Sequence, residues 1–149
     1  MMRKVPLRQR SRSGFTITEM VIALLVAGVM ISGVVAGFVQ YSRQAEWSAH
    51  SLAAQMQAVR RLEQARAAKW QPLGATPEDQ LVSSNFPVLV EVLDVSMTGG
   101  NMVYATNTTS ITTVSTNPPV KMIRVDCTWP FMNRGIMTNS IFTYRAPDQ

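Results

Sequence analysis

The longest apolar run in the sequence extends from Ser13 to Val39 and holds one acidic residue, Glu19, and no basic residue. A helix that spans a bilayer needs roughly 20 mostly apolar residues, and the segment from Phe15 to Val39 is longer than that. The alternative is a helix buried in a soluble core. Because the chain is short and polar sequence lies on both sides of the run, a transmembrane helix is the better interpretation.

Residues 1–14, at the start of the chain, contain five of its 14 lysines and arginines, but no acidic residue. Basic residues beside a membrane helix stay in the cytoplasm, so the N-terminus is expected there and the rest of the chain outside. The same residues account for the net charge of +5, because nine basic and nine acidic residues remain without them. The high pI therefore gives no reason to expect a nucleic-acid partner.

Glu19 needs a separate explanation, because a carboxylate inside hydrocarbon is costly and an ionisable residue there indicates a function by default. It lies near the cytoplasmic end of the run. From that position the side chain could instead reach the headgroups or remain protonated. The residues alone leave both explanations open.

The residues at the start of the run match a known signature. A basic leader ends in Gly14 and is followed by Phe15-Thr16-Ile17-Thr18-Glu19 and then by the apolar segment. This arrangement resembles the cleavage and methylation signature of type IV pilins and of the pseudopilins of type II secretion. The resemblance implies that a prepilin peptidase cuts between Gly14 and Phe15 and methylates the new amino terminus, and that Glu19 acts in assembly.

The resemblance also implies partners and a location. Cutting after Gly14 creates an ammonium group at Phe15, and an opposite charge within about 4–6 Å favours an ionised carboxylate. A subunit already in a filament could thus offer Glu19 to an incoming amine. The implied partners are other pilin or pseudopilin subunits and an inner-membrane assembly platform, and the implied location is the bacterial inner membrane, with a single pass, a periplasmic domain and a filament after assembly.

Four segments are expected: a leader at 1–14, the transmembrane half of a helix at 15–39, its amphipathic half at 40–71 and a small β-rich domain at 72–149. A continuous helix of this kind would be on the order of 80 Å long. Gly33 and Gly37 have the spacing that lets membrane helices approach closely, although glycine is also simply common in such helices. The amphipathic half has an apolar stripe that we expect to contact the sheet, formed by Ala45, Ala49, Leu52, Met56, Val59 and Leu62.

The rest of the sequence predicts strands. β-Branched residues at 88–95 end at a glycine turn at 99–101, a threonine-rich stretch at 101–117 is compatible with edge strands or an ordered loop, and alternation predicts strands at 120–129 and 136–144. Residues 73–85 are expected to form a polar loop. The predicted fold class is α+β and pilin-like, with a long N-terminal helix packed by a small antiparallel β-sheet.

The end of the helix at 61–70 and the strand ends at 128–130 and 143–145 resemble those of minor subunits, the I-type pseudopilins and the V-type minor pilins. We expect no catalytic residue, metal ligand or cofactor, because His50 and Cys127 are the only histidine and cysteine and no phosphate-binding loop is present. His50 is expected at the surface or at a groove edge. Cys127 lies on the apolar side of its strand and is expected to be a buried small hydrophobe, the alternatives being intermolecular pairing and a reactive thiol.

Two other functions remain to be weighed. A DNA-uptake pilus subunit would need an exposed basic face, for which the outer domain offers Lys121, Arg124, Arg134 and Arg145. A membrane-tethered extracytoplasmic binding domain with an uncut signal anchor would keep its leader, and its mature chain would begin at Met1 or Met2.

Overall fold

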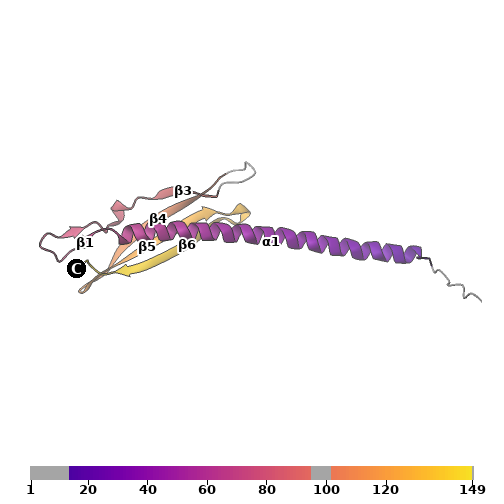
Figure 1. Cartoon of the computed structure of the whole chain (residues 1–149), viewed down its shortest axis with the longest axis horizontal. Helices are drawn as coiled ribbons and strands as arrows, with labels where there is room; N and C mark the ends of the chain where they lie inside the picture. Colours follow the sequence, from indigo (N-terminus) through magenta and orange to yellow (C-terminus); the bar gives the residue numbers. More distant parts are fainter. Residues whose placement is uncertain (1–13, 95–101, 149) are drawn as a thin grey trace, which may run out of the picture. The chain divides into compact units, whose positions relative to one another are not determined.

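The computed structural model describes residues 14–94 and 102–148 and has the predicted α+β class (Figure 1). The chain divides into two compact units, residues 1–43 and 44–149. Most of the leader, at 1–13, and the predicted glycine turn at 99–101 lie outside the described residues. One long helix passes through both units, and the β-strands belong to the second unit.

Helix α1 runs from Ile17 to Arg66 and contains 50 residues. By length and composition it is able to cross a membrane. Its end falls shortly before Pro72, which cannot continue a helix. Strand β1 (Trp70–Gln71) follows and pairs antiparallel with β2 (Glu78–Asp79).

The main sheet has four antiparallel strands in the order β3-β4-β5-β6. Their bounds are Leu89–Asp94, Val103–Thr116, Pro119–Pro130 and Ile136–Arg145. Two short 3-10 helices, η1 (Ser83–Asn85) and η2 (Met132–Arg134), lie in the connections. The predicted strands at 88–95, 120–129 and 136–144 correspond to β3, β5 and β6, within the residues that are described.

The threonine-rich stretch differs from the prediction, because it forms β4, an interior strand of 14 residues and not an edge strand or a loop. Its inward positions Ala105, Asn107 and Thr109 are buried. Threonine is β-branched and suits a pleated strand, so strand propensity is met although the apolar alternation is weak. The alternation of β5 is confirmed, with Ile123, Val125, Cys127 and Trp129 all buried.

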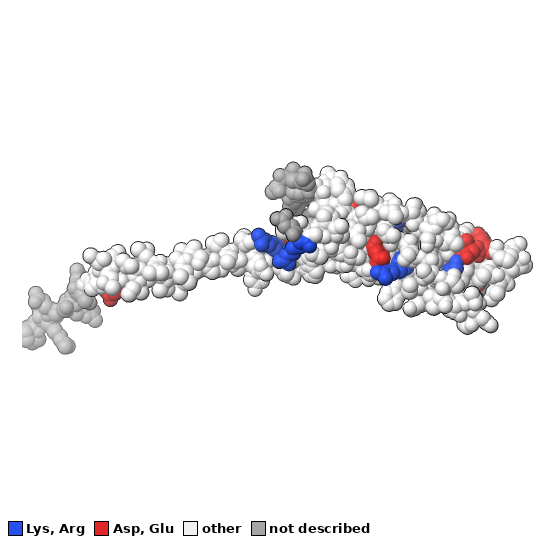
Figure 2. Space-filling model, turned by 180° about the vertical axis from the view of Figure 1, so that it is seen from behind, with Lys and Arg blue, Asp and Glu red and all other residues white. Residues whose placement is uncertain are grey.

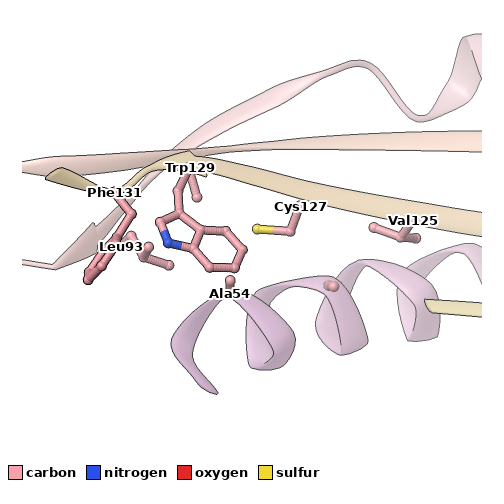
Figure 3. Close-up of a cluster of buried hydrophobic side chains, with 8 residues drawn as sticks. Ala54, Leu93, Val125, Cys127, Trp129 and Phe131 are labelled. Carbon is pink, nitrogen blue, oxygen red and sulfur yellow. The ribbon is translucent and has the colours of Figure 1, made fainter. Parts of the chain in front are cut away.

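The expectation for the helix stripe is wrong for most of its residues, although Leu62 does pack against the core. Leu52, Met56 and Val59 are exposed by 61%, 67% and 44%, and the sheet packs on the small residues Ala54, Ala58 and Ala65 of α1. In Figure 3 the indole of Trp129 and the thiol of Cys127 lie over the helix at Ala54. The bulk of this core comes from the sheet, so the helix contributes residues small enough to let it approach closely.

His50 is also placed differently from the prediction. Its side chain is buried, with 4% of the residue exposed, and its ring meets Phe131 edge to face at 5.9 Å between centroids. On α1 it lies on the same face as the alanines and not on the exposed stripe. A histidine one turn before Ala54 therefore completes the packed face of the helix.

Residues 73–85 are more ordered than a polar loop. Glu78 and Asp79 form β2, and their side chains have basic partners: Lys69 donates to Glu78 at 3.0 Å, and Lys121 donates to Asp79 at 2.6 and 2.7 Å. Lys121 is 8% exposed, also donates to the carbonyl of Leu81 and lies 5.1 Å from the ring centre of Trp70. This buried ammonium holds the connection against the sheet.

Candidate functional site

The first turn of α1 contains a reciprocal pair of side chains. The backbone N–H and the hydroxyl of Thr16 each donate to Oε2 of Glu19 at 2.8 Å, and the backbone N–H of Glu19 points to Oγ1 of Thr16 at 3.3 Å. The backbone N–H of Met20 donates to the carbonyl of Thr16, which starts the helical ladder. The geometry is a capping box, in which a threonine and a glutamate three residues later satisfy donors that a helix start leaves open.

The capping box gives Glu19 a local partner that the sequence analysis did not consider. A threonine followed three residues later by a glutamate, directly before an apolar run, is the sequence sign of this motif. The glutamate also lies in the first turn of α1, where the helix dipole favours negative charge. Its position is therefore explained by helix capping without any partner molecule, and Thr16 joins the residues of the site.

Gly14 and Phe15 precede the helix and are exposed. Phe15 has 84% of its surface accessible, and a β-carbon built at Gly14 would meet no atom within 4 Å. Packing against the described residues therefore does not require glycine at position 14. The peptide bond between these two residues lies in open, non-helical backbone, three residues before the start of α1 at Ile17.

The membrane half of α1 presents apolar side chains on all sides. Figure 2 shows this stretch of the helix as an almost uninterrupted uncharged surface. Gly33 and Gly37 lie within it, and added β-carbons there would also meet nothing within 4 Å. Both positions are thus open to a neighbouring helix, and no contact with the described part of the chain accounts for the two glycines.

A second apolar surface lies on the outer half of α1, where Leu52, Met56 and Val59 follow one another at steps of four and three residues. We call these three residues the outer stripe. Residues at this spacing share one helix face, and all three are exposed while the alanine face is covered by the sheet. Sequence reasoning found the stripe but assigned it to the wrong contact.

The basic residues of the outer domain are largely paired with acids. Besides Lys121, Arg124 lies 2.9 Å from Asp126 and Arg145 lies 2.6 Å from Asp148. On the face in Figure 2, acidic and basic groups lie side by side toward the far end of the domain, and one basic patch, where the uncharged stretch of helix ends, lies apart from them. Of the four basic residues considered for a DNA-binding face, three therefore have a carboxylate partner.

Cys127 is fully buried in the core of the sheet. Burial, followed by the negative charge of Glu91, raises the pKa of its thiol to about 11. The neutral thiol is therefore the form present at ordinary pH, and the prediction of a buried small hydrophobe is confirmed. Among residues 14–94 and 102–148, no group of three or more histidine, cysteine, aspartate or glutamate side chains is arranged to hold a metal ion.

Comparison with known proteins gives one family. Residues 9–35 match the family model described as the prokaryotic N-terminal methylation motif, which includes Gly14, Phe15 and Glu19 and most of the apolar run. No significant match to the chain is found among curated proteins or among solved structures. The match supports the resemblance to pilins and pseudopilins that the leader and the apolar run indicate, and it does not extend into the β-rich unit.

Proposed function

Because residues 9–35 carry the prokaryotic N-terminal methylation motif, we propose that this chain is a structural subunit, a minor pilin or pseudopilin, of a type IV pilus or a type II secretion pseudopilus. The observation that carries the proposal is the motif match together with the apolar helix that continues directly from it. The chain is then not an enzyme but the substrate of one. Prepilin peptidase cuts between Gly14 and Phe15 and N-methylates Phe15.

The geometry around the cut supports this assignment. The bond after Gly14 lies in exposed, non-helical backbone, as a protease requires of its substrate. Among residues 14–94 and 102–148, no packing contact demands a glycine there. The specificity of a processing enzyme accounts for a glycine at position 14, whereas packing against the described residues does not.

Assembly would use the two apolar surfaces of α1. The membrane half, with Gly33 and Gly37, would pack among the helices of sister subunits, and Glu19 would pair with the amine of a neighbouring subunit. The outer stripe extends the same kind of surface beyond the membrane, because its apolar side chains face away from the chain's own sheet. An exposed apolar stripe on a helix is the surface that a second helix covers.

The location follows from the same proposal. The basic residues of the leader would remain in the cytoplasm, the helix would cross the bacterial inner membrane once, and the β-rich unit would lie in the periplasm. The partners would be prepilin peptidase, the inner-membrane assembly platform and other subunits of the filament. Pairing of Lys121, Arg124 and Arg145 with acids leaves little positive charge to attract nucleic acid, which argues against a DNA-uptake subunit.

The first test is the intact mass and amino-terminal sequence of the protein purified from its own membranes. An N-methylated Phe15 is expected, and Gly14→Leu is expected to leave the leader in place. A wild-type chain that still begins at Met1 or Met2 would instead identify a membrane-tethered binding domain with an uncut anchor, and would overturn the proposal.

The second test separates processing from assembly. Glu19→Ala and Met56→Lys are both expected to be cut and methylated normally but to be lost from the filament fraction. Gln44→Lys is the matched control for Met56→Lys, because residue 44 is exposed on the same helix outside the outer stripe. Incorporation of both Glu19→Ala and Met56→Lys at wild-type levels would refute assembly through these surfaces.

A further inference from the structure

The main sheet has two edges that are built differently. β3 and β6 are its outer strands. An edge strand exposes a row of unpaired N–H and C=O groups, which can pair with another chain. Proteins usually protect such an edge with short or bulged strands, charged residues, proline or a covering element.

The edge at β3 has these protections. β3 is six residues long, its pairing with β4 shifts register between Val92 and Asp94, and Pro87 precedes it. Side chains of α1 also bind the backbone near this edge: Gln57 donates to the carbonyl of Val92 in β3 at 3.0 Å, and Arg61 donates to that of Pro87, just before the strand, at 3.3 Å. Glu91 adds an ion pair with Arg60. The helix thus occupies part of this edge.

The edge at β6 has none of them over residues 136–144. The strand has ten residues, pairs with β5 in one unbroken register and contains neither proline nor a charged residue before Arg145. In the described part of the chain, β5 is its only strand neighbour. Asn139 and Arg145 of β6 donate to backbone carbonyls of α1, but among the described residues no side chain of α1 bonds to the backbone of β6. In Figure 1, β6 forms the free margin of the sheet.

Apolar side chains flank this open edge on both faces. On the outer face Ile136, Phe142 and Tyr144 are exposed by 76%, 62% and 58%, and the two aromatic rings contact each other edge to face at 6.0 Å. On the inner face Met137 and Ile141 pack against the core but are only partly buried. A strand added here would cover the exposed side chains of the outer face and complete the burial of Met137 and Ile141.

The charges near the edge define what kind of strand fits. Arg124, the neighbour of Phe142 across β5 and β6, is already paired with Asp126 at 2.9 Å. The side chain of Asp126 also accepts from the hydroxyl of Ser140 on β6. A charged strand that paired with residues 136–144 would therefore find no unpaired opposite charge there. An uncharged strand needs no such partner.

We propose that the open edge of β6 binds an extended, uncharged segment of a partner polypeptide, with apolar side chains at alternate positions, which adds a fifth strand to the sheet. Main-chain hydrogen bonds would supply affinity, and the apolar flanks would select the side chains. Because α1 binds the backbone at the β3 edge, a second copy could reach this edge only through its own β6, and such a dimer is one of the outcomes that the test separates. This proposal does not depend on leader processing, so either can fail alone.

The test uses the full chain in detergent micelles and a labelled, end-blocked peptide of alternating valine and threonine with a short polyethylene glycol tail for solubility. Saturable binding is expected by fluorescence anisotropy, with slower hydrogen exchange at the amides of residues 136–144. Thr138→Lys, on the exposed face of β6, is expected to weaken binding by roughly tenfold or more. Thr108→Lys is the control, because residue 108 is exposed on the same face of the interior strand β4.

A second peptide, N-methylated at alternate residues, tests the backbone contribution. It keeps the side chains but loses the N–H row of one edge, so it is expected not to bind. Equal binding of both peptides would show only apolar adhesion, and binding unaffected by Thr138→Lys would place the site elsewhere. A concentration-dependent dimer that Thr138→Lys abolishes would assign the edge to a second copy. Any of these three results overturns the proposal.

Discussion

The two faces of the outer half of α1 make opposite predictions for substitutions only two residues apart. Ala58 is fully buried beneath β5, among Val125, Cys127 and Trp129, whereas Met56 is 67% exposed. In Ala58→Leu three carbon atoms must enter a packed core, and overpacking of this kind costs about 1–3 kcal/mol. Alanine and leucine have similar helix propensities, so the backbone contributes little to the difference.

Met56→Lys provides the comparison. Methionine and lysine also have similar helix propensities, and surface substitutions usually change the free energy of unfolding by less than about 0.5 kcal/mol. The assay is urea unfolding of the full chain in micelles, followed by the fluorescence of the buried Trp70 and Trp129. With a slope of roughly 1–3 kcal/mol per molar urea, a loss of about 2 kcal/mol moves the midpoint by about 1 M.

The reverse result would refute the assignment of the faces. If Ala58→Leu unfolded at the wild-type midpoint and Met56→Lys lost about 1 kcal/mol or more, the sheet would lie on the outer stripe. The proposal that the stripe is a contact surface for other subunits would then fall with it. Ala54→Leu is a second test of the buried face and is expected to destabilise the fold as Ala58→Leu does, because residue 54 lies one turn earlier and is also fully buried.

Three further predictions concern the β-rich unit. Asp79→Asn leaves the Lys121 ammonium buried beside a neutral amide and is expected to lower the free energy of unfolding by about 1–3 kcal/mol, whereas adding Lys121→Met should recover most of that loss. A double-mutant cycle by urea unfolding measures both changes, and equal destabilisation by Asp79→Asn and by the double variant would contradict the prediction. Burial raises the pKa of the Cys127 thiol to about 11 from an ordinary 9.0, so the contribution of this thiol to stability is complete below pH 9 and falls as the pH rises towards 11. Cys127→Ala should remove that decline, and the thiol of the wild type should react with a maleimide only after unfolding. Hydrogen bonds from the backbone N–H of Trp70 and from the Arg145 side chain lower the pKa of Asp148, so the contribution of this carboxylate to stability is present above pH 4 and is lost as the pH falls further. Acid unfolding curves of wild type and Asp148→Asn should diverge in that range, and coinciding curves would contradict the prediction.

Most of the fold could be predicted from periodicity and from breaker residues. The alternation of apolar residues from Ile123 to Trp129 predicted β5, and Pro72 placed the end of the helix within a few residues. The interior position of β4 could not be predicted, because threonine carries strand propensity without telling a buried face from an exposed one. Asn107 shows the difficulty: it is 1% exposed and bonded to Gln57 of α1, a contact that only the tertiary structure reveals.

The error on the helix face has a definite physical origin. Sequence reasoning took the larger apolar residues, such as Leu52 and Met56, as the buried ones, because burial of larger side chains yields more hydrophobic free energy. In this domain β5 already supplies Trp129 and its neighbours, and close packing leaves room only for alanine at positions 54 and 58 of the helix. Size predicts burial only when the partner surface is not itself bulky.

The capping box at the start of α1 changes how Glu19 would act in assembly. In the chain as described, Oε2 of Glu19 accepts two hydrogen bonds from Thr16. Under the proposed processing, pairing with the amine of a neighbouring subunit could draw the carboxylate away from Thr16, at a net cost of about 0.5–1.5 kcal/mol for each bond released. A carboxylate–ammonium pair in a medium of low dielectric constant is worth more than that, but only when both charges are already desolvated. The cap would then hold Glu19 in its own helix until a second apolar helix excludes water from the site, so that the charge pair forms only in a packed assembly.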